Sequence, residues 1–311
     1  MPPMRAVLVV NPKATTTSER SRDVLVRALR SEVDLSVEIT RRRGHAADLA
    51  RRAIAEKLDV VVTLGGDGTV NEVVNGLLGR EPRPRNTDIP ALAVVPGGST
   101  NVFARALGLP KDPVEGTGAI LDALHLGRVR TIGLGRADER YFTFCAGYGL
   151  DAEVVRKVER ARLRGKVSTA GLYMRSTLTQ YLTEREPRVI TLERPGEEPE
   201  SDLATVIVQN TVPWTYLGNR ALTACPDASF DAGLDVMALR GLHLPTTTRA
   251  VAQILARRPK PHGRQMLTLH DLGTFTLRAL RPMALQVDGD YVGERTKVTF
   301  SAVPDALRVF C

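Results

Sequence analysis

Cysteine and long apolar runs are scarce in this sequence of 311 residues. It contains three cysteines, Cys145, Cys225 and Cys311, and no CxxC pair. An odd count without paired spacing argues against a disulfide framework or a zinc site and favours a reducing cytosol. No run of about 18 apolar residues exists, and the N-terminus shows no cleavable signal pattern. We therefore expect a cytoplasmic protein that contacts a membrane, if at all, only peripherally.

Positive charge is in excess, with 43 Lys and Arg against 35 Asp and Glu and a net charge of +8. Such a surface favours anionic partners, namely nucleotides, nucleic acids or anionic lipid headgroups, with general solubility as the alternative interpretation. Two basic clusters stand out, at 156–166 and 257–264, and each is either a membrane-facing surface or a solvated face. The cations are not interleaved with aromatic residues, and no nucleic-acid-reading motif occurs, so we expect no nucleic-acid partner.

The apolar pattern divides the chain into two parts near residue 130. Apolar runs at 6–10, 35–40, 59–64 and 91–96 predict buried strands, and 19–31 and 45–57 predict helices between them. This alternation predicts an α/β domain with a Rossmann-like parallel sheet over 1–130. From 131 to 294, short runs separated by turn residues predict an antiparallel β-sandwich, with one helix at 246–258.

Three glycines and one aspartate, at 65–68, separate an apolar strand from an apolar helix. Thr69 and Glu72 have the spacing of a capping box, which places the helix start at Thr69. Glycines here let main-chain N–H groups approach a ligand, and a helix N-terminus favours phosphate. Asp67 fits beside a phosphate as a Mg²⁺ ligand or as a base; otherwise it caps a tight turn. The loop is neither GxGxxG nor a P-loop.

Two further polar loops follow apolar strands. The segment PGGSTN (96–101) joins a strand to a helix, and NPKATTT (11–17) follows the first strand. In a parallel sheet these loops meet at the carboxyl ends of the strands, where α/β proteins bind ligands. We therefore expect one shared binding crevice.

The paired motifs GGDGTVNEVVNGL (65–77) and PGGSTNVFARAL (96–107) resemble the diacylglycerol kinase catalytic-domain family, which includes bacterial lipid kinases and sphingosine kinases. Weaker likenesses to that family lie at 11–15, 40–46, 144–155 and 287–290. The resemblance implies an ATP:lipid phosphotransferase whose α/β domain is completed by the chain's return at about 295–311. It also implies an ATP site made by Asn11, Pro12, Lys13, Ala14, Thr15, Thr40, Gly65, Gly66, Asp67, Gly68, Thr69, Val70, Asn71 and Ser99.

The resemblance also implies the catalytic groups. Asp290 corresponds to the family's general base, Asp67 is the second candidate, and Asp151 corresponds to a lipid-contacting position. Hairpin chemistry is the alternative for Asp290, and helix capping is the alternative for Asp151. Asp67 and Asp231 are the candidate Mg²⁺ ligands.

Three departures from the family pattern bear on these roles. Val102 stands where the family has an acidic residue, and Asp290 stands where it has glutamate. Ala232 replaces an aspartate in the segment that resembles a structural magnesium site.

The sequence thus predicts an ATP- and Mg²⁺-dependent lipid kinase at an anionic bilayer surface, with diacylglycerol as the default substrate. Other lipid alcohols, a soluble-substrate kinase of the NAD kinase type, and a lipid-binding protein without catalysis remain open. A homodimer remains open as well.

Overall fold

The chain forms two compact units in a computed structural model that describes residues 3–13, 19–80, 89–149, 152, 153, 156, 190–242 and 244–311. The first unit comprises Met1–Leu134, Glu139–Tyr141 and Pro304–Cys311, and the second comprises Gly135–Asp138 and Phe142–Val303. The strands β5 (Val129–Ala137) and β16 (Asp290–Phe310) contribute residues to both units. The boundaries expected from the sequence, 1–130 with about 295–311 and 131–294, stay a prediction.

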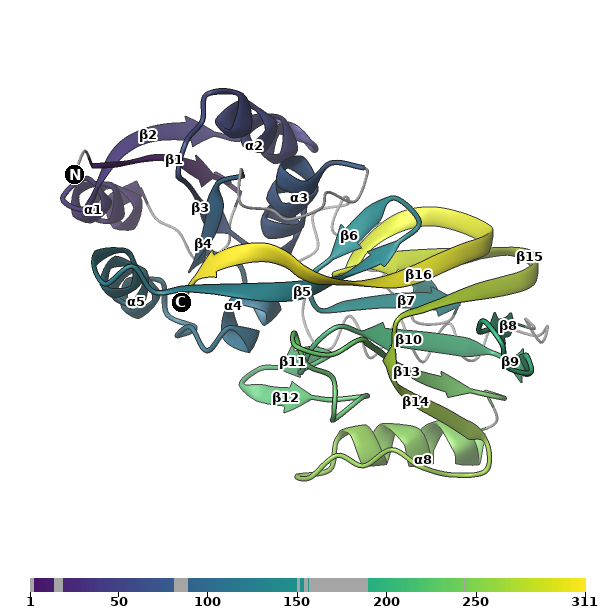
Figure 1. Ribbon diagram of the computed structural model, residues 1–311. Coiled ribbons are helices and arrows are strands. Elements are labelled where there is room, and N and C mark those ends of the chain that lie inside the picture. The colour runs from purple at the N-terminus through teal and green to yellow at the C-terminus, as the bar shows by residue number, and fades with distance from the viewer. Residues whose placement is uncertain are drawn as a thin grey trace. The chain divides into compact units, whose positions relative to one another are not determined.

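The first unit is built on a parallel sheet in the order β4-β3-β1-β2 (Figure 1). Its strands are β1 (Met4–Val10), β2 (Val33–Ile39), β3 (Val60–Gly65) and β4 (Ala91–Pro96). Every residue of β3 and β4 is buried, as expected for central parallel strands covered on both faces. The end of β16 adds a further parallel strand, because Val309 pairs with Leu92 and Phe310 with Ala93.

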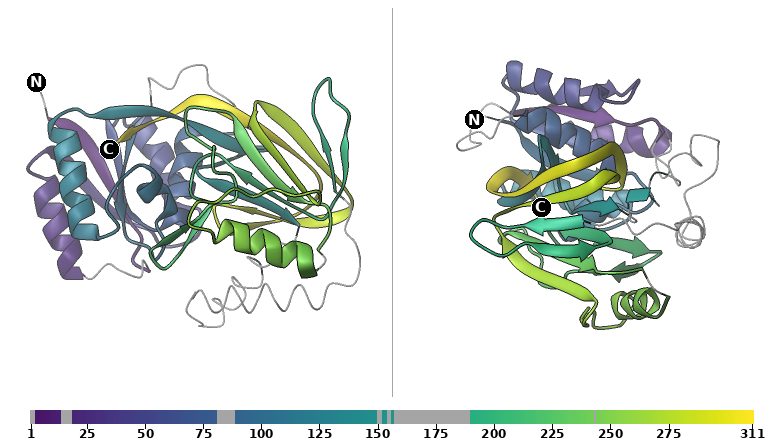
Figure 2. Two further views of the ribbon diagram at one scale, coloured as in Figure 1. Left: turned by 90° about the horizontal axis from the view of Figure 1, so that it is seen from below. Right: turned by 90° about the vertical axis from the view of Figure 1, so that its right-hand side faces the viewer.

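Two pairs of helices cover this sheet, α2 with α3 and α1 with α5 (Figures 1 and 2). The helices are α1 (Glu19–Leu29), α2 (His45–Ala55), α3 (Asp67–Leu78), α4 (Val102–Ala106) and α5 (Pro113–His125). At Gly76 a Cβ atom would lie 2.4 Å from the carbonyl oxygen of Ala47, so glycine is what lets α2 and α3 approach each other. No described helix is both long and apolar enough to cross a bilayer.

The second unit is antiparallel, with the strand order β14-β13-β10-β7-β15-β16. Its remaining strands are β6 (Arg140–Phe142), β7 (Cys145–Gly149), β8 (Ile190–Glu193), β9 (Glu200–Leu203), β10 (Thr205–Gln209), β11 (Thr215–Leu217), β12 (Arg220–Leu222), β13 (Leu234–Leu239), β14 (Met266–Leu272) and β15 (Thr274–Val287), with the helix α8 (Leu244–Ile254) before β14. β15 belongs to both layers of the sandwich. Its first half pairs with β8 and its second half pairs with β7, and a register shift after Arg278 separates the two halves.

One apolar cluster fills the space between these antiparallel layers. Ile190 and Leu192 of β8 belong to the same buried cluster as Val206, Val236 and Phe275. Phe275 stacks on Phe300 with ring centroids 5.2 Å apart. The predicted fold class, a parallel α/β domain followed by an antiparallel sandwich, is confirmed.

Candidate active site

Three loops of the first unit meet at the carboxyl edge of its sheet, as the sequence predicts. The backbone N–H of Asn11, directly after β1, donates to Leu64 O (3.0 Å), and the N–H of Gly97, after β4, donates to Gly65 O (2.8 Å). The side chain of Asn11 also donates to Thr69 Oγ1 at 3.0 Å. The three loops are therefore joined by direct hydrogen bonds rather than by sequence proximity.

The two glycine loops touch through their backbones. A Cβ atom added to Gly98 would lie 2.6 Å from Gly66 Cα, which is too close for any side chain. A Cβ atom at Gly65 would lie 2.7 Å from Thr69 Oγ1. The glycines thus provide close packing of loop against loop, in addition to the open backbone expected for phosphate binding.

Helix α3 begins at Asp67, two residues before the start expected from the capping-box spacing. Its N-cap is Gly66, and no side chain caps it. Glu72 does not reach back to its own helix, because its carboxylate accepts the N–H groups of Gly44 (2.8 Å) and Ala46 (3.2 Å). The expected capping box is absent, and Glu72 instead caps the start of α2, whose N-cap Gly44 has no side-chain cap of its own.

The carboxylate of Asp67 ties the first glycine loop to the second. Its two oxygens accept the backbone N–H groups of Val102 and Phe103, each at 3.0 Å. These are the first two residues of α4, so Asp67 caps a helix, although not the one it belongs to. Asn101 closes the second loop in a left-handed conformation (φ 49°), with both ends of its amide bonded to Gly98 at 2.8 Å.

Other predicted nucleotide-binding residues differ in exposure. Pro12, Lys13 and Ser99 are exposed, and Thr40 is half-buried at the end of β2, where its N–H donates to Val10 O at 2.8 Å. Val70 is buried, and Ala14 and Thr15 lie outside the described residues. All of them stay predictions as ATP ligands.

Asn71 has a structural environment. It is fully buried, its amide donates to Tyr141 O at 3.0 Å, and Arg140 donates to its Oδ1 at 2.7 Å. Asn75, one turn later, binds the same short strand β6 from both ends of its amide. These two asparagines fasten β6 to α3, a role that no spacing rule in the sequence indicates. The assignment of Asn71 to the ATP site stays a prediction.

The motif VDGD forms the turn of the hairpin between β15 and β16. Asp288 (φ 49°) and Gly289 (φ 80°) are the two turn residues, and Val287 pairs with Asp290. Left-handed angles at both turn positions match the Asp-Gly hairpin type expected from this sequence. The hairpin interpretation is thus correct for the segment, and it leaves Asp290 half-buried at the first position of β16.

Asp288 has a role that the sequence did not reveal. Its carboxylate is 5% exposed and accepts four hydrogen bonds, from the N–H and hydroxyl of Thr143 and from the N–H groups of Phe144 and Cys145 (2.8–3.2 Å). It therefore fixes the turn between β6 and β7 to the hairpin that carries Asp290. Buried carboxylate oxygens need donors nearby, and these four donors lie about 145 residues away in the sequence.

A cation lies next to the strand that begins at Asp290. Arg156 forms ion pairs with Glu153 and, at 2.9 Å, with Glu294, and its guanidinium stands 5.8 Å from the ring centroid of Tyr291. Glu153 is buried, so its charge is balanced by this arginine. Asp151, the predicted lipid contact two residues before Glu153, lies outside the described residues.

The two predicted metal ligands, Asp67 and Asp231, are both carboxylates. Asp231 is exposed and its N–H donates to Ser229 Oγ at 3.2 Å. Among the residues that the structure describes, no three His, Cys, Asp or Glu side chains form a metal-binding group. A Mg²⁺ ion held by one carboxylate and nucleotide phosphates needs no such group. Asp67 and Asp231 stay predictions as metal ligands.

Comparison with known proteins tests the resemblance seen in the sequence. Residues 5–137 match the model of the diacylglycerol kinase catalytic domain. Diacylglycerol kinase of Bacillus subtilis (strain 168) is 27% identical over 292 residues, which cover 93% of this chain and 90% of that protein. The resemblance to the diacylglycerol kinase catalytic-domain family is confirmed. The prediction that the chain is a kinase is confirmed with it.

Two further comparisons extend this result. Diacylglycerol kinase of Staphylococcus aureus (strain MRSA252) is 36% identical over 149 residues, covering 47% of this chain and 44% of that protein. A crystal structure of a diacylglycerol kinase from Bacillus anthracis str. Sterne has a TM-score of 0.76 at 22% identity and covers 98% of this chain and 96% of the other. At that identity the structural likeness establishes the fold.

Proposed function

We propose that this protein is an ATP-dependent lipid kinase that phosphorylates the hydroxyl of a membrane lipid, with diacylglycerol, giving phosphatidic acid, as the first candidate. The relatives in the family are named diacylglycerol kinases, which supports a lipid alcohol as acceptor. A sphingoid base, a monoacylglycerol or a soluble acceptor of the NAD kinase type is the alternative substrate.

The observation that carries the proposal is the contact between the two glycine loops at the start of α3. Gly66 caps this helix without a side chain, and Gly98 packs directly against it. A helix N-terminus without a side-chain cap presents main-chain N–H groups to an anion, and the helix dipole favours negative charge there. Residues 66–68 are half-buried, so they are partly accessible to a ligand. This arrangement suits the phosphates of ATP.

Asp67 suits a bound Mg²⁺ ion on chemical grounds. Each of its oxygens already accepts one N–H group, and a carboxylate oxygen has a second lone pair with which to bind a cation. The two hydrogen bonds hold the carboxylate in one orientation at the edge of the phosphate loop. When bound, Mg²⁺ would neutralise charge on the transferred phosphate. Lys13, exposed after β1, is the nearby cation in the predicted ATP set.

Asp290 is the proposed general base. The lipid hydroxyl oxygen forms a bond to the γ-phosphorus of ATP as the bond from that phosphorus to the β–γ bridging oxygen breaks. The hydroxyl proton passes to the Asp290 carboxylate, and ADP leaves with the bridging oxygen. Such proton acceptance contributes about 10²–10⁴-fold in rate. Asp288 supports it indirectly, because its four hydrogen bonds fix the turn from which Asp290 emerges.

The decisive experiment is a radiolabelled ATP assay against a panel of lipid alcohols in micelles that contain anionic lipid. We expect label on diacylglycerol and its loss, by about 10²-fold or more, in Asp290→Asn. Label on soluble acceptors alone would overturn the lipid assignment. An Asp290→Asn enzyme with full turnover would overturn the assignment of the base.

The matched variant is Asp288→Asn in the same hairpin. It removes a buried carboxylate with four donors, which costs about 3 kcal/mol of stability or more, because donors are left unpaired. We expect Asp288→Asn to lower the melting temperature and Asp290→Asn to leave it nearly unchanged. This contrast separates a structural aspartate from a chemical one.

A further inference from the structure

The segment 241–270 has an unusual charge content. It contains five cations, at Arg249, Arg257, Arg258, Lys260 and Arg264, and neither Asp nor Glu. The whole chain has a net charge of only +8, so much of its excess is concentrated in this one segment. Its five cations lie on α8 and on the stretch 257–265 that leads back to β14. We call these two elements the α8 surface.

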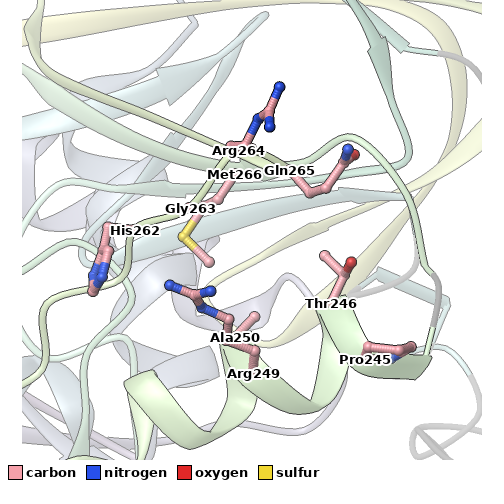
Figure 3. Close-up of a pocket in the computed structure, with 9 residues that line it drawn as sticks. All are labelled: Pro245, Thr246, Arg249, Ala250, His262, Gly263, Arg264, Gln265 and Met266. Atoms are coloured by element: carbon pink, nitrogen blue, oxygen red, sulfur yellow. The ribbon is translucent and has the colours of Figure 1, made fainter.

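A groove of about 270 Å³ lies between α8 and the returning stretch (Figure 3). Arg249 extends from α8 towards Gly263, and a Cβ atom at Gly263 would lie 3.9 Å from its guanidinium carbon. His262, Arg264 and Met266 line the other wall. Arg249 and Met266 point into this groove, whereas the guanidinium of Arg264 points away from α8 (Figure 3).

The returning stretch is fastened to α8 by one side chain. Gln253 accepts the N–H of His262 at 3.1 Å and donates to its carbonyl oxygen at 3.2 Å. Pro259 and Pro261 restrict the same stretch, because proline fixes one backbone angle. The cations of the α8 surface are thus presented on an ordered support.

All five cations are exposed. Within the part of the chain that the structure describes, none of them pairs with a carboxylate or contacts an aromatic ring. No carboxylate among the described residues therefore neutralises them, which favours an anionic partner.

We propose that the α8 surface docks the protein on an anionic phospholipid bilayer. The phosphates of the headgroups lie against the five cations, and the groove receives one of them. On α8, Val251 is 41% exposed and Ala252 beside it is also exposed, so uncharged residues lie among the cations. Arg249 is the one cation of this helix, and the other four lie on the stretch that follows it. Exposed apolar side chains next to cations suit the interface of a membrane.

The composition of the α8 surface disfavours a nucleic acid as the occupant. Residues 244–270 include no Phe, Tyr or Trp on which a base could stack. A bilayer needs no stacking platform, only charge spread over an area. The inference rests on the proposed function in one respect, namely that a lipid kinase must reach its substrate in a membrane.

The test is co-sedimentation of the full chain with vesicles of phosphatidylcholine containing about 30% phosphatidylglycerol, without ATP. We expect Arg249→Gln/Arg264→Gln to weaken binding about tenfold or more, from about fivefold for each cation lost near such a surface. A second variant, Arg257→Gln/Arg258→Gln, has the same expected effect. Both change exposed residues, and circular dichroism checks their folding.

The matched control is Arg128→Gln/Arg220→Gln, which removes two exposed arginines elsewhere and the same net charge. We expect it to retain binding within about twofold. Equal losses in all three variants would overturn the assignment, because general charge would then explain binding. Tight binding to a 30-nucleotide RNA but not to vesicles would overturn it as well, as would full displacement by millimolar inorganic phosphate.

Turnover on a short-chain diacylglycerol in neutral detergent separates this inference from the proposed function. We expect the α8-surface variants to keep it. Loss of vesicle binding with retained turnover supports docking at this surface, whereas wild-type vesicle binding without any turnover contradicts the kinase proposal alone.

Discussion

Asp67 joins the two glycine loops at the scale of single residues. It caps α4 through Val102 and Phe103, and we propose that it also faces the nucleotide's phosphates. We expect Asp67→Ala to lose about 1 kcal/mol of stability for the cap and about 10²-fold or more in turnover. Thermal melting and the ATP assay measure the two effects separately.

Asp112 offers the control for this change. It is also a capping aspartate, and it accepts the N–H groups of Val114 and Glu115 at the start of α5. Asp112→Ala removes a cap of the same kind outside the predicted site, so stability falls by about 1 kcal/mol while turnover stays. If Asp67→Ala behaves in the same way, Asp67 is a cap and nothing more.

Asp235 gives a pH dependence at the same scale. Burial raises the pKa of its carboxyl, and hydrogen bonds from the Asp271 N–H and from His270 only partly oppose this rise. The folded chain therefore binds this proton at a pH where an unfolded aspartate, with a pKa of about 3.9, has released it. Stability from this group grows as pH falls from the raised folded pKa towards the unfolded one, and is lost as pH rises.

We expect this effect to disappear in Asp235→Asn. Urea unfolding of both proteins between about pH 4 and pH 7 gives their difference in unfolding free energy, in which groups that do not contact Asp235 cancel. The unfolding free energy of the wild-type protein should rise relative to that of the variant as pH falls. A difference that is constant, or that changes in the opposite direction, would contradict the assignment.

Helix α5 offers a test at the scale of one element, because two of its glycines differ in surroundings. A Cβ atom at Gly116 would lie 2.7 Å from Pro96 Cδ, at the end of β4, whereas one at Gly118 would meet nothing within 4 Å. We expect Gly116→Ala to destabilise by about 1–3 kcal/mol and Gly118→Ala to stabilise by about 0.5–1 kcal/mol. Melting temperatures of the two variants should move in opposite directions.

The elements that the sequence predicts well are those with a strong local pattern. β4 occupies 91–96 as expected, and α2 and β3 are correct to within two residues, because apolar periodicity reflects burial directly. α5 was missed, although Asp112 and Pro113 form a clear start signal, because two glycines dilute its pattern. Glu72 was assigned to the wrong helix, since spacing reports sequence neighbours and its partners lie 26 and 28 residues away.

The candidate site, too, was predictable where it depends on topology and not where it depends on long-range contacts. The convergence of three loops could be predicted from the topology of a parallel sheet alone. The contact of Gly66 with Gly98 and the four bonds to Asp288 could not, because they depend on tertiary packing between segments far apart in the chain. Long-range polar contacts leave no periodic trace in a sequence.

At the scale of the whole molecule, the first unit depends on residues that follow the second. Ala306, Leu307, Val309 and Phe310 are buried there, and the last two pair with β4. We expect a chain ended after Val303 to lose about 10 °C or more in melting temperature, and to lose protection from hydrogen exchange in β4 before β13. A chain that lacks Cys311 alone is the control. Unchanged protection of β4 in the shorter chain would show that this strand is dispensable.

The pairing of Val309 and Phe310 with β4 also has a consequence for synthesis on the ribosome. The parallel sheet is translated first, yet its last strand emerges only after the whole of the antiparallel unit. A nascent chain therefore exposes an unpaired edge of β4 until the end of β16 has been synthesised. A messenger RNA truncated late in its coding region yields a product whose parallel sheet lacks this strand.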